Sequence, residues 1–158
     1  MTVAPTGSIS FPGESTAAGH VGSIELANFD MSVLQAVSTA SAGSGAGAGR
    51  ASFKGFNFSK RIDNTTASFL KAESQGVHIP TATIVFDTNT LPKYLTITFS
   101  DVQVSSDVIS GSAGELPKEQ ITLQAGQVEW TYQKDGPSGT MSGPPTSYCW
   151  NFTQNVAC

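Results

Sequence analysis

Three charged side chains lie close together in the stretch FKGFNFSKRIDNTT, residues 53–66, of a chain that carries few charges. Lys60, Arg61 and Asp63 stand where an aromatic-rich strand pattern gives way to polar residues. Residues of these types suit a binding site, a catalytic constellation or the entry to a helix. A carboxylate is favourable near the N-terminus of a helix, so we predict that Asp63 marks a helix entry.

Other residues with catalytic or metal-binding chemistry are few and poorly spaced. His20 and His78 are the only histidines, and neither has a second histidine or a cysteine at ligand spacing, so no zinc site is expected. Glu115 and Glu119, spaced across ELPKE, could pair as acid and base, although solvated loop carboxylates are commoner. Motifs for a nucleophile elbow, a phosphate loop or a dinucleotide-binding turn are missing. We expect no catalytic residues, no metal, no cofactor and no enzymatic activity.

The composition narrows the class of protein and of partner. The 158 residues suit one domain, 1–158. The net charge of −4 disfavours nucleic acid, because phosphate binding needs clustered basic residues. The first residues, MTVAPTGSIS, lack the pattern of a secretory signal, and no apolar run reaches the ~20 residues of a membrane span. We therefore expect no membrane insertion, and export by a route that uses no signal peptide.

The elements that would position these residues read mainly as strands. In each of four apolar stretches the hydrophobic positions alternate and then change parity near the middle. A strand has a side-chain period of two, so such a change indicates a bulge or a bend. Bent strands are typical of a small closed barrel, in which they reach both sides of one core. The four stretches are residues 24–33, 53–58, 95–104 and 121–132.

One segment has the pattern of a helix. TTASFLKAESQG, residues 65–76, contains good helix formers, begins with Thr65 and Thr66 and ends at Gly76. About ten residues make a marginal helix in isolation. It should therefore dock on the barrel and cover one opening, with Asp63, Thr65 and Thr66 forming its entry.

Two other segments leave alternatives open. Residues 37–50, VSTASAGSGAGAGR, contain almost no large side chain, which predicts a mobile loop that is either functional or a plain hairpin connection. Cys149 and Cys158 lie beyond disulfide reach if the segment between them is extended at ~3.3 Å per residue, whereas a hairpin would allow a bridge.

Four segments, residues 13–15, 59–66, 101–105 and 117–132, follow one another in an order and spacing that resemble the haemolysin-coregulated protein (Hcp) family of type VI secretion. The likeness covers nearly the whole chain, and it rests on order and spacing rather than on one motif. A closing tail with Trp150 and Asn155 also resembles part of the family and argues against a Cys149–Cys158 bridge. The matching residues are Gly13, Glu14 and Ser15; Ser59, Lys60, Asp63, Thr65 and Thr66; Asp101, Val102, Val104 and Ser105; and Pro117, Glu119, Trp130 and Tyr132.

The resemblance implies a β-barrel of two antiparallel sheets with one flanking short α-helix and a C-terminal arm, residues 136–158. It also implies six-membered rings that stack into a tube, a surrounding sheath, a spike at the tip and small effector proteins in the lumen. The tube would assemble in the cytoplasm and then be secreted. Lys60 and Arg61 become candidates for the subunit interface, or else a solvated strand end. The candidate ring-stacking residues are Ser41, Gly43, Ser44, Gly45, Gly47, Gly49 and Arg50.

A second interpretation is a monomeric barrel of the same fold that acts as a stand-alone secreted binding module. Tyr148 and Trp150 would then offer an aromatic surface to a glycan or a peptide. An enzyme or toxin is the third interpretation, but the roughly twenty residues after Tyr132 are too few for a catalytic domain. The molecular mass in solution distinguishes a ring from a monomer.

Overall fold

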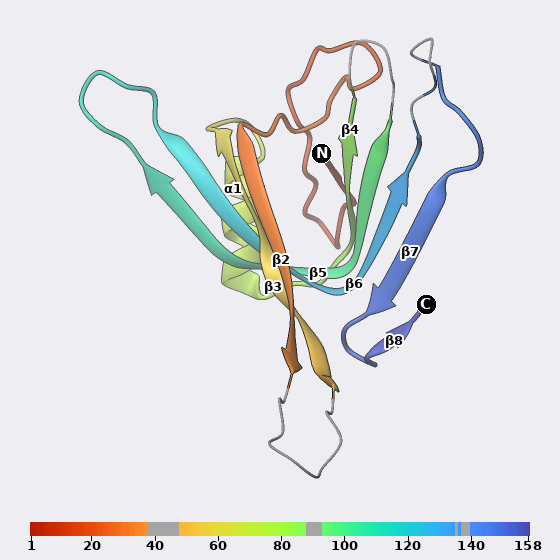
Figure 1. Ribbon diagram of the computed structural model, residues 1–158. Coiled ribbons are helices and arrows are strands. Elements are labelled where there is room, and N and C mark those ends of the chain that lie inside the picture. The colour runs from red at the N-terminus through yellow and green to blue at the C-terminus, as the bar shows by residue number, and fades with distance from the viewer. Residues whose placement is uncertain (38–47, 88–92, 135, 137–139) are drawn as a thin grey trace.

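The computed structural model describes residues 1–37, 48–87, 93–134, 136 and 140–158, and these form a mainly β structure with one short helix (Figure 1). This confirms the predicted class. The elements are β1 (Thr2–Val3), β2 (Asn28–Val37), β3 (Ala48–Arg61), α1 (Thr66–Gln75), β4 (Ile79–Phe86), β5 (Leu95–Ser110), β6 (Lys118–Tyr132), β7 (Thr146–Asn151) and β8 (Val156–Ala157).

The strands form one antiparallel sheet that bends into two halves. Its order is β1-β4-β5-β6-β3-β2, and β7 and β8 continue from β6. The first part of β6 pairs with β3, whereas its last part pairs with β7. Strands β5 and β6 pair along almost their whole length, so they run through both halves and join them (Figure 1).

The two joining strands bend together at one corner. Asp101 in β5 adopts a left-handed backbone with φ of 53°, and Gly126 lies opposite, where an added Cβ would come within 3.1 Å of the Asp101 carboxylate. The strands keep one register across this corner. The buried residues of β5 nevertheless change from Phe99 to Val102, so the core lies on opposite parities before and after it. This confirms the predicted change of phase.

Bulges bend the strands elsewhere. Lys54 is an extra residue in β3 opposite the step from Ser32 to Val33 in β2, and Ser105 is an extra residue in β5. Gly55, next to the first bulge, has φ of 114°, a conformation that a side chain would strain.

The prediction of a closed barrel is wrong. In the described ranges, no pairing joins β2 at one end of the sheet to β1 or β4 at the other. The segment before β2 is largely irregular, and it fills the inside of the bent sheet with buried Ile9, Phe11 and Ile24. The core is therefore covered on this side by chain that does not pair with β2.

The helix closes another side of the core and has the predicted ends. It begins at Thr66 and stops at Gly76, whose left-handed φ of 58° lets its N–H bond back to the last turn. Phe69 is fully buried, with its ring 5.0 Å from that of Phe11 and 6.0 Å from that of Phe58. Within the described ranges, no helix has the length and apolar character needed to cross a membrane.

Of the two alternatives for Cys149 and Cys158, the hairpin with a bridge is the one that the structure shows, and the resemblance of the tail, which argues against a bridge, is misleading for this pair. They form a disulfide, with Cα atoms 5.3 Å apart. The tail is not extended, because β7 and β8 form a hairpin that pairs Trp150 with Ala157. Asn155 in the turn has φ of 59°, which asparagine tolerates better than most residues.

Candidate assembly surface

Two free strand edges lie on opposite sides of the half-sheet that contains β2, β3, the first part of β6 and the last part of β5. Strand β2 pairs only with β3 in the structure as described, so its other edge is open. Strand β4 pairs with β5 only as far as Val102, so among the described strands residues 103–110 of β5 have β6 as their only neighbour. Open edges present unpaired backbone groups to other chains.

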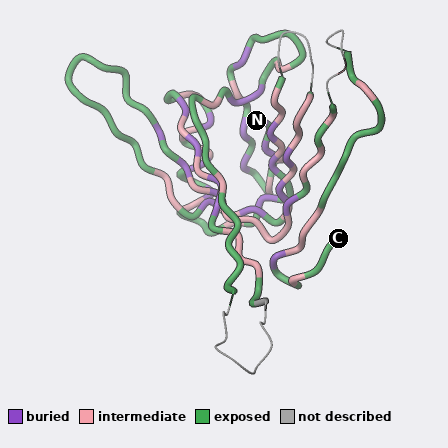
Figure 2. Tube along the Cα trace, viewed as in Figure 1, coloured by how far each residue is buried: buried purple, intermediate pink, exposed green. Residues whose placement is uncertain are grey.

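Exposed apolar side chains occur along both edges. Leu34 on β2 is 54% exposed, and Val108 on β5 is 51% exposed. Figure 2 shows that the outer ends of the β2–β3 and β5–β6 hairpins are largely exposed. Val33 and Val37 on β2 and Ile109 on β5 are also exposed, as is Leu116 in the connection between β5 and β6. Each of the two open edges therefore carries its own exposed apolar surface.

Five of the seven candidate stacking residues belong to a segment that the structure does not describe, and the other two lie in β3. Ser41, Gly43, Ser44, Gly45 and Gly47 lie outside the described residues. Gly49 and Arg50 belong to β3. The Arg50 guanidinium donates hydrogen bonds to the backbone oxygens of Phe152, at 2.7 Å, and Thr153, so it is engaged within the chain.

The structure places Lys60 inside the protein. Its side chain is buried, and its Nζ lies 2.8 Å from the Asp63 carboxylate and 2.6 Å from that of Glu119. It therefore offers no exposed surface to a neighbouring copy, while Arg61 remains exposed. The reason is the pairing of β3 with β6, which sets Lys60 directly opposite Glu119.

The prediction for Glu119, a solvated loop carboxylate or the partner of Glu115 in an acid–base pair, does not match the structure. Glu119 is instead a fully buried strand residue, whereas Glu115 is exposed and accepts a hydrogen bond from Ser112. The structure does not bring the two carboxylates together as a pair. The signal that could have placed Glu119 is its strand register opposite Lys60.

The predicted helix entry is part of the same buried cluster. The Asp63 carboxylate accepts hydrogen bonds from the Thr65 N–H at 2.8 Å and the Thr65 hydroxyl at 2.6 Å. The Thr66 hydroxyl donates to Glu119 at 2.6 Å and accepts from Lys60 at 3.1 Å. Burial opposes ionisation of Asp63, but the hydrogen bonds from Lys60 and Thr65 outweigh it and lower the pKa of Asp63.

Asp107 adds an acid to this cluster that the sequence did not reveal. Burial and the negative charge of Glu119 raise the pKa of Asp107 to about 7. Both Asp107 oxygens and one oxygen of Glu119 are buried and find no hydrogen-bond donor among the described residues. Protonation of Asp107 removes one of the two negative charges from this buried site.

The raised pKa predicts how stability depends on pH. The folded state binds a proton at Asp107 more tightly than the unfolded state, so this group favours folding below pH 4, and its contribution is lost as pH rises through about 7. Asp107→Asn should flatten this loss, which is at most about 1.4 kcal/mol per pH unit. Urea unfolding from pH 4 to 8 measures it. The exposed-site variant Glu115→Gln should keep the wild-type slope, and parallel curves for Asp107→Asn and wild type would contradict the prediction.

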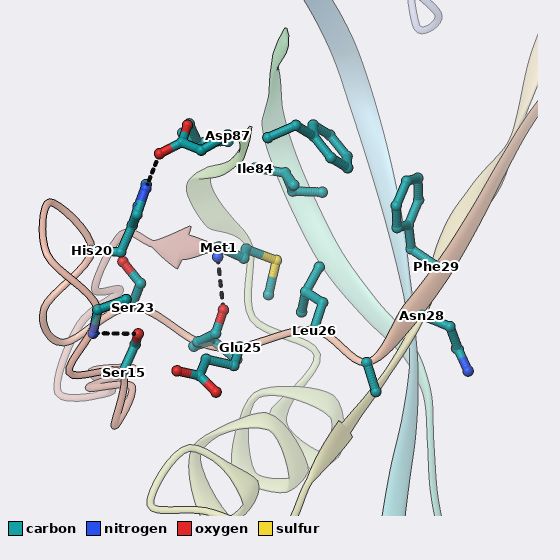
Figure 3. Close-up of a pocket in the computed structure, with 15 residues that line it drawn as sticks. Met1, Ser15, His20, Ser23, Glu25, Leu26, Asn28, Phe29, Ile84 and Asp87 are labelled. Atoms are coloured by element: carbon teal, nitrogen blue, oxygen red, sulfur yellow. Dashed lines mark hydrogen bonds and ion pairs between the residues drawn. The ribbon is translucent and has the colours of Figure 1, made fainter. Parts of the chain in front are cut away.

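A cavity of about 670 Å³ opens between the N-terminal segment, the end of β4 and the start of β2 (Figure 3). Leu26, Phe29 and Ile84 supply an apolar lining, and His20 pairs with Asp87 at the rim (Figure 3). His78 pairs separately with Asp101. The described part of the chain contains no group of three or more residues that could hold a metal ion.

The chain is similar in sequence to proteins of one known family. A family model described as "Type VI secretion system effector, Hcp" matches residues 3–132. Over 104 residues the chain is 38% identical to the protein hcp1 of Pseudomonas aeruginosa, a match that covers 63% of this chain and 64% of that protein. The chain thus matches less than two thirds of that relative's length.

Solved structures extend the similarity to the fold. A structure described as a type six secretion system protein has a TM-score of 0.87 and 25% identity, over 94% of each chain. The crystal structure of Hcp1 from Salmonella typhimurium has a TM-score of 0.77 and 27% identity, over 94% of this chain and 93% of that one.

Proposed function

The chain belongs to the Hcp family of type VI secretion, and from this premise we propose that it builds the tube of such a system. Six copies form a ring, and rings stack into a hollow tube whose lumen carries small effector proteins. A sheath surrounds the tube and a spike complex sits on its tip. The tube assembles in the cytoplasm and leaves the cell by a signal-peptide-independent route, and the protein does no chemistry of its own.

One observation carries the ring proposal: the two open edges lie on opposite sides of one half-sheet. An edge-to-edge contact between β2 of one copy and β5 of the next uses two different surfaces, so it is heterologous. Heterologous contacts generate rings when the rotation between copies closes. The exposed apolar residues on both edges support the same contact. Arg61, which is exposed at the end of β3, would form an ion pair with an acidic group of the neighbouring subunit.

Molecular mass in solution tests this proposal. Light scattering after size-exclusion chromatography should give six times the mass of 16.4 kDa, and negative-stain microscopy should show six-fold rings. A strict monomer at high protein concentration would overturn the ring. Such a result would favour a stand-alone binding module.

A specific feature favours that second candidate function. Trp130, Tyr148 and Trp150 form a row of stacked rings on β6 and β7, with successive centroids 6.2 and 6.3 Å apart. Tyr148 is 56% exposed. A row of aromatic faces can take a sugar ring or an apolar peptide side chain. Binding of either by a monomer, lost in Tyr148→Ala, would support the module.

Deletion of residues 41–47 tests the proposed stacking role of the small-residue segment. The deletion leaves β2 and β3 as they are described, so rings should still form. Stacking into long tubes should be lost, because the segment would contact the next ring. Electron microscopy at high protein concentration compares the two states. Long tubes in the deletion variant would remove this role, and replacement of 41–47 by seven other small residues serves as the length control.

A further inference from the structure

The C-terminal hairpin is closed by its disulfide. Strand β8 has only two residues, and two backbone pairings join it to β7. The Cys149–Cys158 bond and a hydrogen bond of 3.3 Å from the Cys158 N–H to the Cys149 carbonyl hold the open end of the hairpin. So short a pairing is marginal in water without a further constraint. Inside the turn, the Asn155 N–H donates to the Asn151 carbonyl at 2.7 Å and the Phe152 N–H donates to the Gly126 carbonyl at 2.8 Å, and the covalent bond adds the constraint that closes the end of the hairpin.

The turn of this hairpin forms hydrogen bonds with the beginning of β3, about one hundred residues earlier in the sequence. Arg50 donates to the carbonyls of Phe152 and Thr153. The Ala51 N–H donates to the Asn155 side-chain oxygen at 3.1 Å. These contacts require a turn conformation in which the Phe152 and Thr153 carbonyls and the Asn155 side-chain oxygen all face β3.

This end of β3 has few other attachments. Strand β3 pairs with β6 only from Phe56 onward, so the earlier residues of β3 pair only with β2 among the described strands. Phe53 adds two ring contacts, to Phe152 with centroids 5.5 Å apart and to Phe99 of β5 with centroids 6.0 Å apart. The C-terminal hairpin therefore supplies the hydrogen bonds that tie Arg50 and Ala51, at the outer end of the β2–β3 hairpin, to the other half of the sheet (Figure 1).

We propose that the Cys149–Cys158 bond is a redox-controlled clasp on the outer end of the β2–β3 hairpin. Oxidation holds the turn at residues 152–155 against Arg50 and Ala51. Reduction opens the short hairpin, and the outer end of β2–β3 is released without unfolding the rest of the sheet.

The closing step needs an oxidant of the glutathione disulfide class. The Cys149 thiolate attacks that disulfide, forms a mixed disulfide and expels one glutathione thiolate. The Cys158 thiolate then attacks the Cys149 sulfur and expels the second. The two protein thiols lose two electrons and two protons, and one glutathione disulfide becomes two glutathione thiols.

The biological order of the two states rests on the proposed function. Cytosol keeps thiols reduced, whereas the exterior of the cell allows disulfides to persist. A subunit that is assembled inside and exported would carry the clasp open during assembly and closed after export.

Hydrogen exchange of the purified protein tests the clasp directly. The Ala51 amide should exchange about 10 to 100 times faster after reduction with a phosphine reductant than in the oxidised protein. Amides of β4 and of the β5–β6 corner should be unchanged. The double variant Cys149→Ser/Cys158→Ser should show the fast rate with or without reductant, and Asn155→Ala should show it even when oxidised.

Two results would overturn the proposal. One is an Ala51 exchange rate that reduction leaves unchanged, and the other is loss of protection throughout the sheet, which would make the disulfide a global constraint. The contacts between the C-terminal hairpin and β3 lie within one chain, so the exchange comparison between oxidised and reduced protein can be made whether the protein is monomeric or hexameric. Failure of the clasp is therefore distinguishable from failure of the ring, which is read from mass.

Discussion

Replacing Leu34 with lysine should leave the protein folded and convert its ring into monomers. Leu34 lies on the open edge of β2 with 54% of its surface exposed, so the substitution costs little in the isolated chain. In the proposed ring the same side chain packs against the β5 edge of a neighbour. Burying a lysine there, in place of an apolar side chain, should cost about 2 to 4 kcal/mol at each interface. Natural edge strands use lysine to block such pairing.

Light scattering measures this effect, and circular dichroism checks that the fold is retained. Leu70→Lys is the matched control, because Leu70 is an exposed leucine on α1 that lies on neither edge. It should keep the wild-type mass. A Leu34→Lys protein that stays six-membered would remove β2 from the interface. Val108→Lys, on the opposite edge, should also give monomers if the contact is heterologous.

The second large effect should come from Lys60→Met. This change removes the cation that neutralises Asp63 and Glu119 while it keeps an unbranched side chain of similar length. Breaking a buried ion pair from one side costs about 3 to 5 kcal/mol, because the remaining charge is left uncompensated. Asp107, whose carboxyl oxygens are also buried and whose pKa is raised in part by the charge of Glu119, adds a further acidic group to the cluster. Thermal and urea unfolding should report this loss.

Arg61→Met provides the control for charge removal. Arg61 neighbours Lys60 in sequence but is exposed, so its loss should change the free energy of unfolding by less than about 0.5 kcal/mol. Adding Glu119→Leu to Lys60→Met should recover part of the stability, since apolar replacement of a whole buried pair is often neutral. Equal effects of Lys60→Met and Arg61→Met would contradict the buried cluster.

Local patterns predicted several parts of this fold. The change of hydrophobic phase at Phe99–Val102 predicted the corner, because burial forces one face of each strand inward. The start and stop of α1 followed from threonine at one end and Gly76 at the other. Both signals lie within a few residues of the feature that they predict.

Sequence patterns could not predict the features that depend on pairing between residues far apart in the chain. The burial of Lys60 follows from its register opposite Glu119, almost sixty residues away. Asp107 enters the cluster beyond the bulge at Ser105, which shifts the partners of β5 by one position. The Cys149–Cys158 bond depends on a turn that Asn155 makes with a left-handed backbone. No local period of apolar residues encodes these three outcomes.

The passage of β5 and β6 through both half-sheets has a consequence for how the chain folds. Their connection spans only residues 111–117, so this hairpin closes with little loss of chain entropy and supplies a template for β3, β4 and β7. We expect φ-values to be highest at the Asp101–Gly126 corner and low in β2, which pairs only with β3 among the described strands and is expected to join last. The two halves should then appear in kinetics as one cooperative unit with a single relaxation.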